Sequence, residues 1–304
     1  MKKTELEFRA LGTDIHLQVI CDDWQKNVAE NNLRAVKDFY ISVEKIFSRF
    51  DENSELSYFN QNLGKFLKAS PHFMVLAKKN LEYYTLSEEI FDPRIIEILE
   101  WIGYEKDFRK SVPAVNVEKD FPKTIFPKLA QDLIIQNEEV VFKKRMDFAG
   151  IAKGYVTDMA GEMLKKAGFQ NFLIDSGGDM FVAGVDQKGE SWKIDVAGIA
   201  ENKILLILKN EAVATSGIGK RKWESGGKRF HHLVNPKELE NFSFDLQSVT
   251  VVAPSVTEAD FWAKVLFLKG KVEGKKFASE HKIKSIFLDY RGNAWISGEM
   301  KNNI

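Results

Sequence analysis

Residues 147–158, DFAGIAKGYVTD, form a stretch that runs from a predicted strand end into the start of a helix. Its small residues lead into the clearest helical pattern of the chain, in which apolar positions from Val156 to Ala167 share one face and Gly168 supplies the C′ residue. Small residues let a ligand approach the backbone, and the amides at a helix N-terminus suit a phosphate. The stretch therefore predicts a strand-to-helix junction that is either an anion site or a plain turn.

Lys153 lies in the first turn of this expected helix, where the helix dipole disfavours a positive charge. An exposed lysine there costs roughly 0.3–1 kcal/mol, and an anion bound beside it would offset that cost. The alternative is a solvated lysine whose charge is offset by Asp158. The glycine spacing matches neither the Walker motif nor the dinucleotide-binding motif, so the residues leave both interpretations open.

On both sides of this stretch, alternating patterns predict strands, and apolar residues three to four apart predict helices. The strongest helical patterns are a long one from Leu33 to Phe50, one with Ser70 as N-cap and Pro71 at N1, and one that Thr257 caps and Gly270 ends. Strands are expected at residues 5–21, 133–135, 140–142, 172–174, 180–183, 192–196, 204–208, 212–215, 246–253, 285–288 and 294–296.

The expected strands come in clusters with helices between them, and the connections within a cluster have the length of hairpins. This order favours antiparallel pairing and indicates an α+β fold rather than a doubly wound parallel sheet. Residues 104–137 are charged and contain three of the seven prolines, so we expect irregular structure there with one or two helical turns.

Three further motifs have structural explanations as well as functional ones. The SGGD stretch at residues 176–179 could cradle a ligand, but a hairpin turn explains its paired glycines better. The adjacent His231 and His232 point to opposite faces of an extended segment, so at most one of them faces a given site. Residues 91–93 (FDP) are typical of the start of a helix or turn.

Asp260 lies three residues after Thr257, and this capping-box spacing explains both residues as the start of a helix. A carboxylate near a helix N-terminus can also hold a metal ion beside a phosphate, and Lys264, four residues on, would share its face. The pattern by itself favours the cap.

The composition excludes several classes of protein. The 44 Lys and Arg residues balance 44 Asp and Glu residues, so the chain lacks the basic field of a general nucleic-acid or anionic-membrane binder. The one cysteine, Cys21, cannot form an intramolecular disulfide, and no Cys/His cluster has zinc spacing. We expect a cytoplasmic protein without a membrane span, because the sequence shows neither a signal-peptide pattern nor an apolar run of spanning length.

Taken in order, these segments resemble the FAD:protein FMN transferase family, the ApbE flavin transferases. The resemblance extends nearly end to end and includes residues 11–13, 48–50, 54–57, 91–93, 147–158, 177–179, 215–217, 232–236 and 248–270. It implies a single domain over residues 1–304, an α+β fold of two intimate lobes with largely antiparallel sheets, flanking helices and FAD in a central cleft.

The resemblance also implies an activity: the FMN portion of FAD is moved onto a threonine hydroxyl of a partner protein, AMP is released, and Mg²⁺ assists. His232 would lie near the transferred phosphate, where a neutral imidazole could take the threonine proton. Asp260 would be the second catalytic residue and, with the Gly150 carbonyl, a Mg²⁺ ligand. The residues implied to contact FAD are Leu11, Phe50, Phe91, Asp92, Asp147, Lys153 and Leu233.

The sequence departs from the family in two places. Lys264 stands where the family has a threonine that helps to hold the metal, and a protonated lysine cannot ligate Mg²⁺. Residues 237–239 (KEL) stand where the family usually reads Arg-Thr-Gly. One interpretation is that Lys264 replaces part of the metal's charge and neutralises the pyrophosphate directly. Lys264 also keeps two other functions open, namely an FAD-binding protein with impaired or lost transfer and an FAD pyrophosphatase that yields FMN and AMP.

Overall fold

The computed structural model describes residues 1–104, 127–196, 198–199, 204–219, 221–239 and 241–304. The chain divides into two compact units. Unit 1 comprises Met1–Ser42, Lys153–Gly217 and Phe244–Ile304, and unit 2 comprises Val43–Ala152 and Ile218–Ser243. The expectation that residues 1–304 form a single domain stays a prediction.

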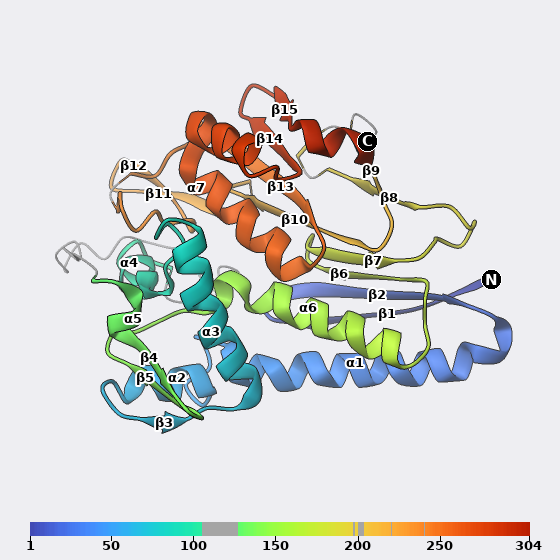
Figure 1. Ribbon diagram of the computed structural model, residues 1–304, viewed down its shortest axis with the longest axis horizontal. Coiled ribbons are helices and arrows are strands. Elements are labelled where there is room, and N and C mark those ends of the chain that lie inside the picture. The colour runs from blue at the N-terminus through green and yellow to red at the C-terminus, as the bar shows by residue number, and fades with distance from the viewer. Residues whose placement is uncertain (105–126, 197, 200–203, 220, 240) are drawn as a thin grey trace. The chain divides into compact units, whose positions relative to one another are not determined.

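Unit 1 is built on an eight-stranded sheet in which all neighbouring strands are antiparallel (Figure 1). This confirms the α+β prediction. In spatial order the strands are β1 (Lys2–Ala10), β2 (Thr13–Cys21), β6 (Phe172–Ser176), β7 (Met180–Ala183), β10 (Glu211–Gly217), β13 (Leu246–Ala253), β14 (Ser285–Asp289) and β15 (Ala294–Ile296).

Helices α6 (Ala149–Lys166) and α7 (Val256–Glu280) cover one face of this sheet (Figure 1). Gly161 lets α6 approach the rings of Phe172 and Phe181, and α7 packs on β10 and β13. The helix α1 (Lys26–Phe47) follows the short turn η1 (Asp23–Gln25), and Tyr40 in it contacts Phe8 of β1. The boundary between the units falls within α1 and within α6.

The opposite face of the sheet is covered by the hairpin β8 (Trp192–Asp195) and β9 (Leu205–Leu208) and by the C-terminal η3 (Gly298–Asn303). Because side chains alternate across a strand, Leu173 and Val182 point away from α6 and into this second layer. They pack there with Trp192, Leu208 and Met300. The sheet of unit 1 thus lies between two hydrophobic layers.

Unit 2 is a mixture of short elements around a cluster of aromatic rings. The rings of Phe59, Phe73, Phe142 and Phe148 contact one another in stacked, tilted and edge-to-face pairs, with centroids 4.3–5.8 Å apart. The elements are α2 (Glu55–Gln61), β3 (Leu67–Lys68), α3 (Pro71–Leu86), η2 (Pro93–Ile95), α4 (Ile96–Trp101), α5 (Leu129–Asp132), β4 (Leu133–Gln136), β5 (Glu139–Phe142), β11 (Lys222–Ser225) and β12 (Lys228–His231).

Most of the expected elements are present, with shifted ends. The Ser70 hydroxyl caps α3, as predicted, by accepting a hydrogen bond from the Phe73 amide. The long helix α1 begins at Lys26 and ends at Phe47 rather than spanning Leu33 to Phe50. The irregular segment predicted at 104–137 falls largely on residues 105–126, which lie outside the described residues, and α5 and β4 follow it.

The prediction for α7 was wrong at both ends. Ser255, not Thr257, is the N-cap, because its side chain accepts from the Glu258 amide. Gly270 does not end the helix; it has a φ of 78° and a ψ of −177°, and the chain continues helically to Glu280. A glycine tolerates this conformation, which makes Gly270 a kink instead of a terminus.

No helix within the described part of the chain is both long enough and apolar enough to cross a membrane.

Candidate functional site

In unit 1, the first halves of α6 and α7 are held against each other at one contact. Gly154 packs on the backbone of Thr257 so closely that a Cβ at Gly154 would lie 2.8 Å from the Thr257 nitrogen. One turn further, Asp158 accepts hydrogen bonds from the amides of Val256 (2.6 Å) and Thr257 (2.9 Å). Lys153 and Asp260 each lie within one helical turn of this contact.

Lys153 forms an ion pair with the buried Asp179. Asp179 ends the SGGD turn, its side chain is 3% exposed, and its Oδ1 accepts a hydrogen bond from the Thr215 amide (3.4 Å). The Lys153 side chain is 26% exposed. The prediction that Lys153 lies in the first turn was wrong, because α6 begins at Ala149. Its countercharge is Asp179, since Asp158 is engaged at the start of α7.

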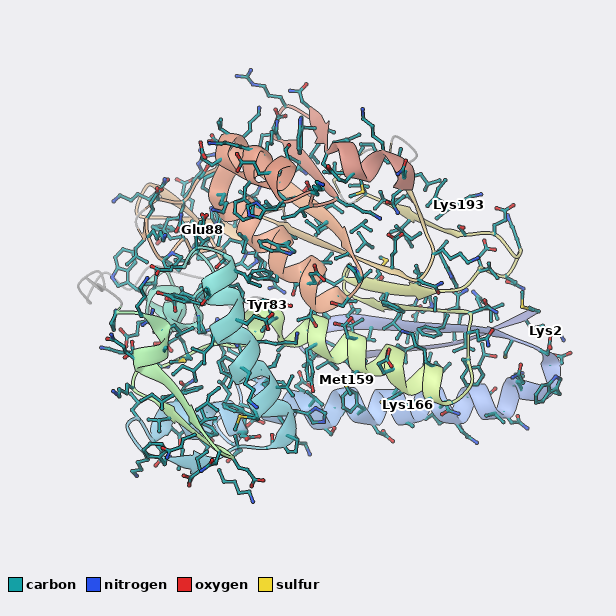
Figure 2. All side chains as sticks on the ribbon, in the orientation of Figure 1. Lys2, Tyr83, Glu88, Met159, Lys166 and Lys193 are labelled. Atoms are coloured by element: carbon teal, nitrogen blue, oxygen red, sulfur yellow. The ribbon has the colours of Figure 1, made fainter. Side chains whose placement is uncertain are left out.

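The last turn of α6 shows the ordinary placement of lysines on a helix. Lys165 and Lys166 lie there, where the helix dipole favours a cation. Lys166 is labelled in Figure 2. Lys153 lies near the other end of the same helix, so its position depends on the carboxylate of Asp179.

The SGGD turn is the hairpin turn between β6 and β7 that the glycines predict. The Ser176 amide donates to the Asp179 carbonyl (2.9 Å), and Gly177 has a φ of 69°. A Cβ at Gly177 would lie 1.9 Å from the Thr13 Oγ1. Thr13 lies two residues after Leu11, so the turn at residues 11–13 meets the SGGD turn, which is far from it in the sequence.

A buried group of hydroxyls supports this turn. The Tyr40 hydroxyl lies 2.8 Å from the Ser176 Oγ, and the Thr157 Oγ1 donates to the Ser176 Oγ (2.7 Å) or the Lys153 carbonyl (2.9 Å). Burial raises the pKa of Tyr40 to about 12, so the phenol stays neutral. Tyr40 and Thr157 were missed in the sequence, where they read as ordinary members of amphipathic helices.

Asp260 and Lys264 form a second lysine–aspartate pair near the contact between α6 and α7. They lie one turn apart on α7, and the Lys264 Nζ donates to the Asp260 Oδ1. The Asp260 side chain is 3% exposed and that of Lys264 is 19% exposed. Within the described ranges, the buried Oδ2 of Asp260 has no hydrogen-bond partner. The capping role predicted for Asp260 was wrong, because its side chain pairs with Lys264 and Ser255 caps the helix.

In unit 2, Asp147 joins the start of α6 to an arginine–aromatic cluster. Its Oδ1 accepts from the Ala149 amide (2.8 Å), and its Oδ2 lies 3.1 Å from the Nε of Arg49. The Arg49 guanidinium lies over the rings of Phe50 (4.3 Å) and Tyr104 (4.7 Å). Phe50 is 46% exposed, so its outer side remains available for a stacking contact.

Residues 91–93 lie against the DFAG segment of unit 2. The Asp147 amide donates to the Pro93 carbonyl (2.8 Å), and a Cβ at Gly150 would lie 2.9 Å from the Phe91 ring. Asp92 is buried and bound to Arg94 through both of its oxygens, at 3.0 Å and 2.7 Å. The turn predicted at Asp92 is confirmed, and its side chain helps to build that turn.

The two adjacent histidines have different environments, as the strand pattern predicts. His231 at the end of β12 is 2% exposed and its Nε2 lies 3.0 Å from the Ser243 carbonyl. Burial lowers its pKa to about 4. His232 is half-buried, its Nδ1 lies 3.4 Å from the Arg221 carbonyl, and its ring meets Tyr104 edge to face. Leu233, which follows, is buried.

The predicted residues therefore form groups within each unit. Unit 1 holds Leu11, Lys153 and Asp260 on or near the connected α6, α7 and SGGD segments. Unit 2 holds Phe50, Asp147 and His232 around Arg49 and Tyr104, with Phe91, Asp92 and Gly150 beside them. Among the residues that the structure describes, no three His, Cys, Asp or Glu side chains gather as a metal site would require.

Several known proteins are similar to this chain in sequence or in structure over most of its length. The FAD:protein FMN transferase of Haemophilus influenzae is 23% identical over 310 residues, covering 97% of this chain and 89% of that protein. That of Chlamydia pneumoniae is 29% identical over 81% of this chain and 79% of its own length. The solved ApbE protein of Thermotoga maritima superimposes with a TM-score of 0.83 at 22% identity, over 99% of both chains.

The family model described as "ApbE family" matches residues 11–287, which include the Lys153–Asp179 and Asp260–Lys264 pairs of unit 1 and the Asp147 and His232 groups of unit 2. This chain therefore belongs to the ApbE family.

Proposed function

We propose that this protein is a flavin transferase that moves the FMN portion of FAD onto a threonine hydroxyl of a partner protein and releases AMP. Its family and its FAD:protein FMN transferase relatives support this proposal. The observation that carries it is the design of unit 1, where two partly exposed lysines are each held by a buried aspartate near the contact between α6 and α7. Two such ammonium groups could bind a pyrophosphate, because it is an anion.

The proposed reaction is a phosphoryl transfer. The threonine oxygen forms a bond to the phosphorus of the FMN half, the bond from this phosphorus to the bridging oxygen breaks, and AMP leaves with that oxygen. The threonine proton goes to a base. Catalysis of such a step depends on neutralising the phosphate charge and aligning the nucleophile.

We propose that Lys153 contacts the pyrophosphate and that Leu11, on the turn beside Gly177, contacts the nucleotide. From unit 2, Phe50 offers an exposed ring, while Phe91, Asp147 and Leu233 complete the proposed flavin contacts. Asp92 holds its loop through Arg94, so we assign it a positioning role instead of a direct contact.

We propose His232 as the base that takes the threonine proton. If its Nδ1 carries the hydrogen toward the Arg221 carbonyl, the Nε2 lone pair is the one that accepts. His231 is unsuited, since burial lowers its pKa to about 4 and its Nε2 is engaged with Ser243. Asp260 is assigned a supporting role: it orients Lys264.

The resemblance also predicts Mg²⁺ at Gly150 and Asp260, and that ion stays a prediction. The donors of unit 1 do not fit it as they stand. Mg²⁺ is usually held by one or two accessible carboxylates together with water and phosphate oxygens, whereas one Asp260 oxygen is paired with the Lys264 ammonium and the other is buried. An ammonium has no acceptor and repels a divalent ion. We therefore route no step through a metal.

A second candidate is an FAD-binding protein that does not transfer. Lys264 favours it, because the resemblance places a metal-holding threonine at this position and the lysine instead occupies Asp260. This protein would retain the flavin contacts and lack the metal ion that the resemblance predicts at the pyrophosphate. The cytoplasmic location and the identity of the acceptor also stay predictions.

The test incubates the full chain with FAD and a peptide that bears the acceptor threonine, in parallel with Mg²⁺ and with EDTA. Mass spectrometry measures FMN on the peptide, and chromatography measures free FMN and AMP. FMN on the peptide with one AMP released per transfer is expected. Free FMN without peptide modification would indicate a pyrophosphatase, and intact bound FAD would indicate the binding protein.

The base is tested with His232→Ala, and His16→Ala on β2 serves as the matched histidine control. We expect His232→Ala to lose at least about 100-fold in transfer rate, the usual size of a general-base contribution, with FAD affinity nearly unchanged. Transfer at the wild-type rate in His232→Ala would remove His232 from the mechanism.

A further inference from the structure

Lys264 has a feature that neither the family resemblance nor the proposed transfer requires. Its side chain is 19% exposed and forms an ion pair with Asp260, whose side chain is 3% exposed. The other pair near the contact between α6 and α7 has the same construction, with the Lys153 side chain 26% exposed and the Asp179 side chain 3% exposed. In both pairs, the carboxylate is buried and the lysine side chain stays partly exposed.

We propose that Lys264 is the built-in cation of this site, so that the two ammonium groups of Lys153 and Lys264 neutralise the FAD pyrophosphate and no divalent ion is bound at Asp260. That FAD is the ligand depends on the proposed function. That no divalent ion binds at Asp260 depends only on the Asp260–Lys264 pair.

The charge balance supports this assignment. A buried carboxylate is costly without a countercharge, and Lys264, one turn further on the same face of α7, supplies it. Together the lysines bring two positive charges, and a pyrophosphate diester carries two negative charges at neutral pH. Each lysine has three donor hydrogens, so pairing with one carboxylate oxygen leaves donors for phosphate oxygens.

The remaining buried oxygen of Asp260 does not by itself make a site for a divalent ion. The Oδ2 is a single donor atom, and in the described parts of the chain it is not joined by two further acidic, histidine or cysteine ligands. An ion at Oδ2 would lie beside the Lys264 ammonium on the same carboxylate. Replacement of Lys264 by an uncharged side chain would remove that repulsion and leave Asp260 in need of a cation.

The first experiment measures binding of Mn²⁺, as a spectroscopic substitute for Mg²⁺, to the ligand-free protein by electron paramagnetic resonance. We expect no stoichiometric binding by the wild type and about one ion per Lys264→Thr chain. Lys276→Thr, at an exposed position of the same helix, is the matched control and should resemble the wild type. Stoichiometric Mn²⁺ binding by the wild type would overturn the proposal.

The second experiment measures FAD affinity by titration with EDTA or with Mg²⁺ present. Wild-type affinity should agree within about twofold between the two conditions, and Lys264→Arg should keep this independence because the charge remains. Lys264→Thr should bind FAD at least about tenfold more weakly in EDTA, as expected for one lost charge-assisted contact, and recover with Mg²⁺. A wild-type affinity that rises tenfold with Mg²⁺ would overturn the proposal.

The two proposals fail in different ways. If the wild type excludes Mn²⁺ and binds FAD equally well in EDTA but never modifies the peptide, the transfer proposal is wrong and the assignment of Lys264 stands. If the peptide is modified only when Mg²⁺ is present and Mn²⁺ binds to the wild type, the transfer proposal stands and the assignment of Lys264 is wrong.

Discussion

The buried ion pairs of the two units differ in which partner is exposed. In unit 2, Arg94 is fully buried together with both of its partners, Asp92 and Asp132. In unit 1, the carboxylates of Asp179 and Asp260, near the contact between α6 and α7, are buried while their lysines stay partly exposed, and Asp289 with Lys271 repeats this arrangement further along α7. A planar guanidinium satisfies several fixed acceptors at once, whereas an ammonium on a flexible stem can bind one carboxylate and a ligand together. We infer that the first arrangement builds structure and the second prepares a site.

The largest change in stability that tests this comparison is expected from a substitution of Arg94. Its Nη1 donates to Asp132 (2.6 Å) and the Pro127 carbonyl (2.8 Å), and its Nη2 donates to Asp92 (2.7 Å). Arg94→Met would leave two buried carboxylates without a countercharge and should lower the free energy of unfolding by about 3–5 kcal/mol. Urea unfolding measures it, with the exposed Arg34→Met as control. A loss below about 1 kcal/mol would break the comparison.

The next largest effect concerns the sealed histidine of unit 2. Because the pKa of His231 is lowered to about 4 by burial, the unfolded chain takes up its proton first as the pH falls. Stability from this group is therefore present above about pH 6.5 and is lost as the pH falls to about 4, by at most about 3 kcal/mol. Urea unfolding at pH 7, 6 and 5 measures the slope. His231→Gln should flatten it, and His232→Ala should leave it unchanged.

Lys153 tests the other side of the comparison, where function should suffer more than stability. Lys153→Ala removes a partly exposed ammonium and should weaken FAD binding about tenfold or more, because one charge-assisted contact to the pyrophosphate is lost. Lys165→Ala, on the exposed side of the same helix, is the control. Titration with FAD and thermal unfolding are measured on both variants. Unchanged FAD affinity in a destabilised Lys153→Ala protein would make this pair structural, like that of Arg94.

The smallest effect on stability is expected at Tyr40, whose hydroxyl contacts Ser176 and Thr157 beside the SGGD turn. Tyr40→Phe removes one buried hydroxyl, while Ser176 and Thr157 keep their mutual hydrogen bond, so about 1 kcal/mol of stability should be lost at pH 7. Because burial raises the pKa of Tyr40 to about 12, the wild type loses further stability between about pH 10 and 12. The difference between the two proteins should therefore shrink over that range of pH.

Local patterns predicted most of the secondary structure. The Ser70–Pro71 start of α3 and the Gly168 end of α6 were read correctly, because cap hydrogen bonds and a positive φ depend on a few neighbouring residues. The start of α7 was misread for the same reason. Thr257 satisfies the local pattern of a cap, but a carboxylate from another helix, Asp158, binds its amide and hydroxyl.

The candidate residues were also found from the sequence, but their partners were not. One of the two interpretations of Lys153 takes Asp158 as its countercharge because the two are close along the chain, whereas Asp179, at the β6–β7 turn, is its partner in the structure. Arg49, which joins Asp147 to two aromatic rings, gave no signal of its own beyond its place beside Phe50.

The family, the α+β class and a set of candidate site residues could be inferred from the sequence alone, because spacing, turn glycines and caps are properties of neighbouring residues. Only the tertiary structure decided which charges neutralise one another and which of them reach solvent. Those outcomes depend on contacts between residues far apart in the chain, such as Gly154 with Thr257 and Gly177 with Thr13, where the absence of a Cβ lets two segments approach. Burial then fixes the carboxylates and leaves the lysines exposed.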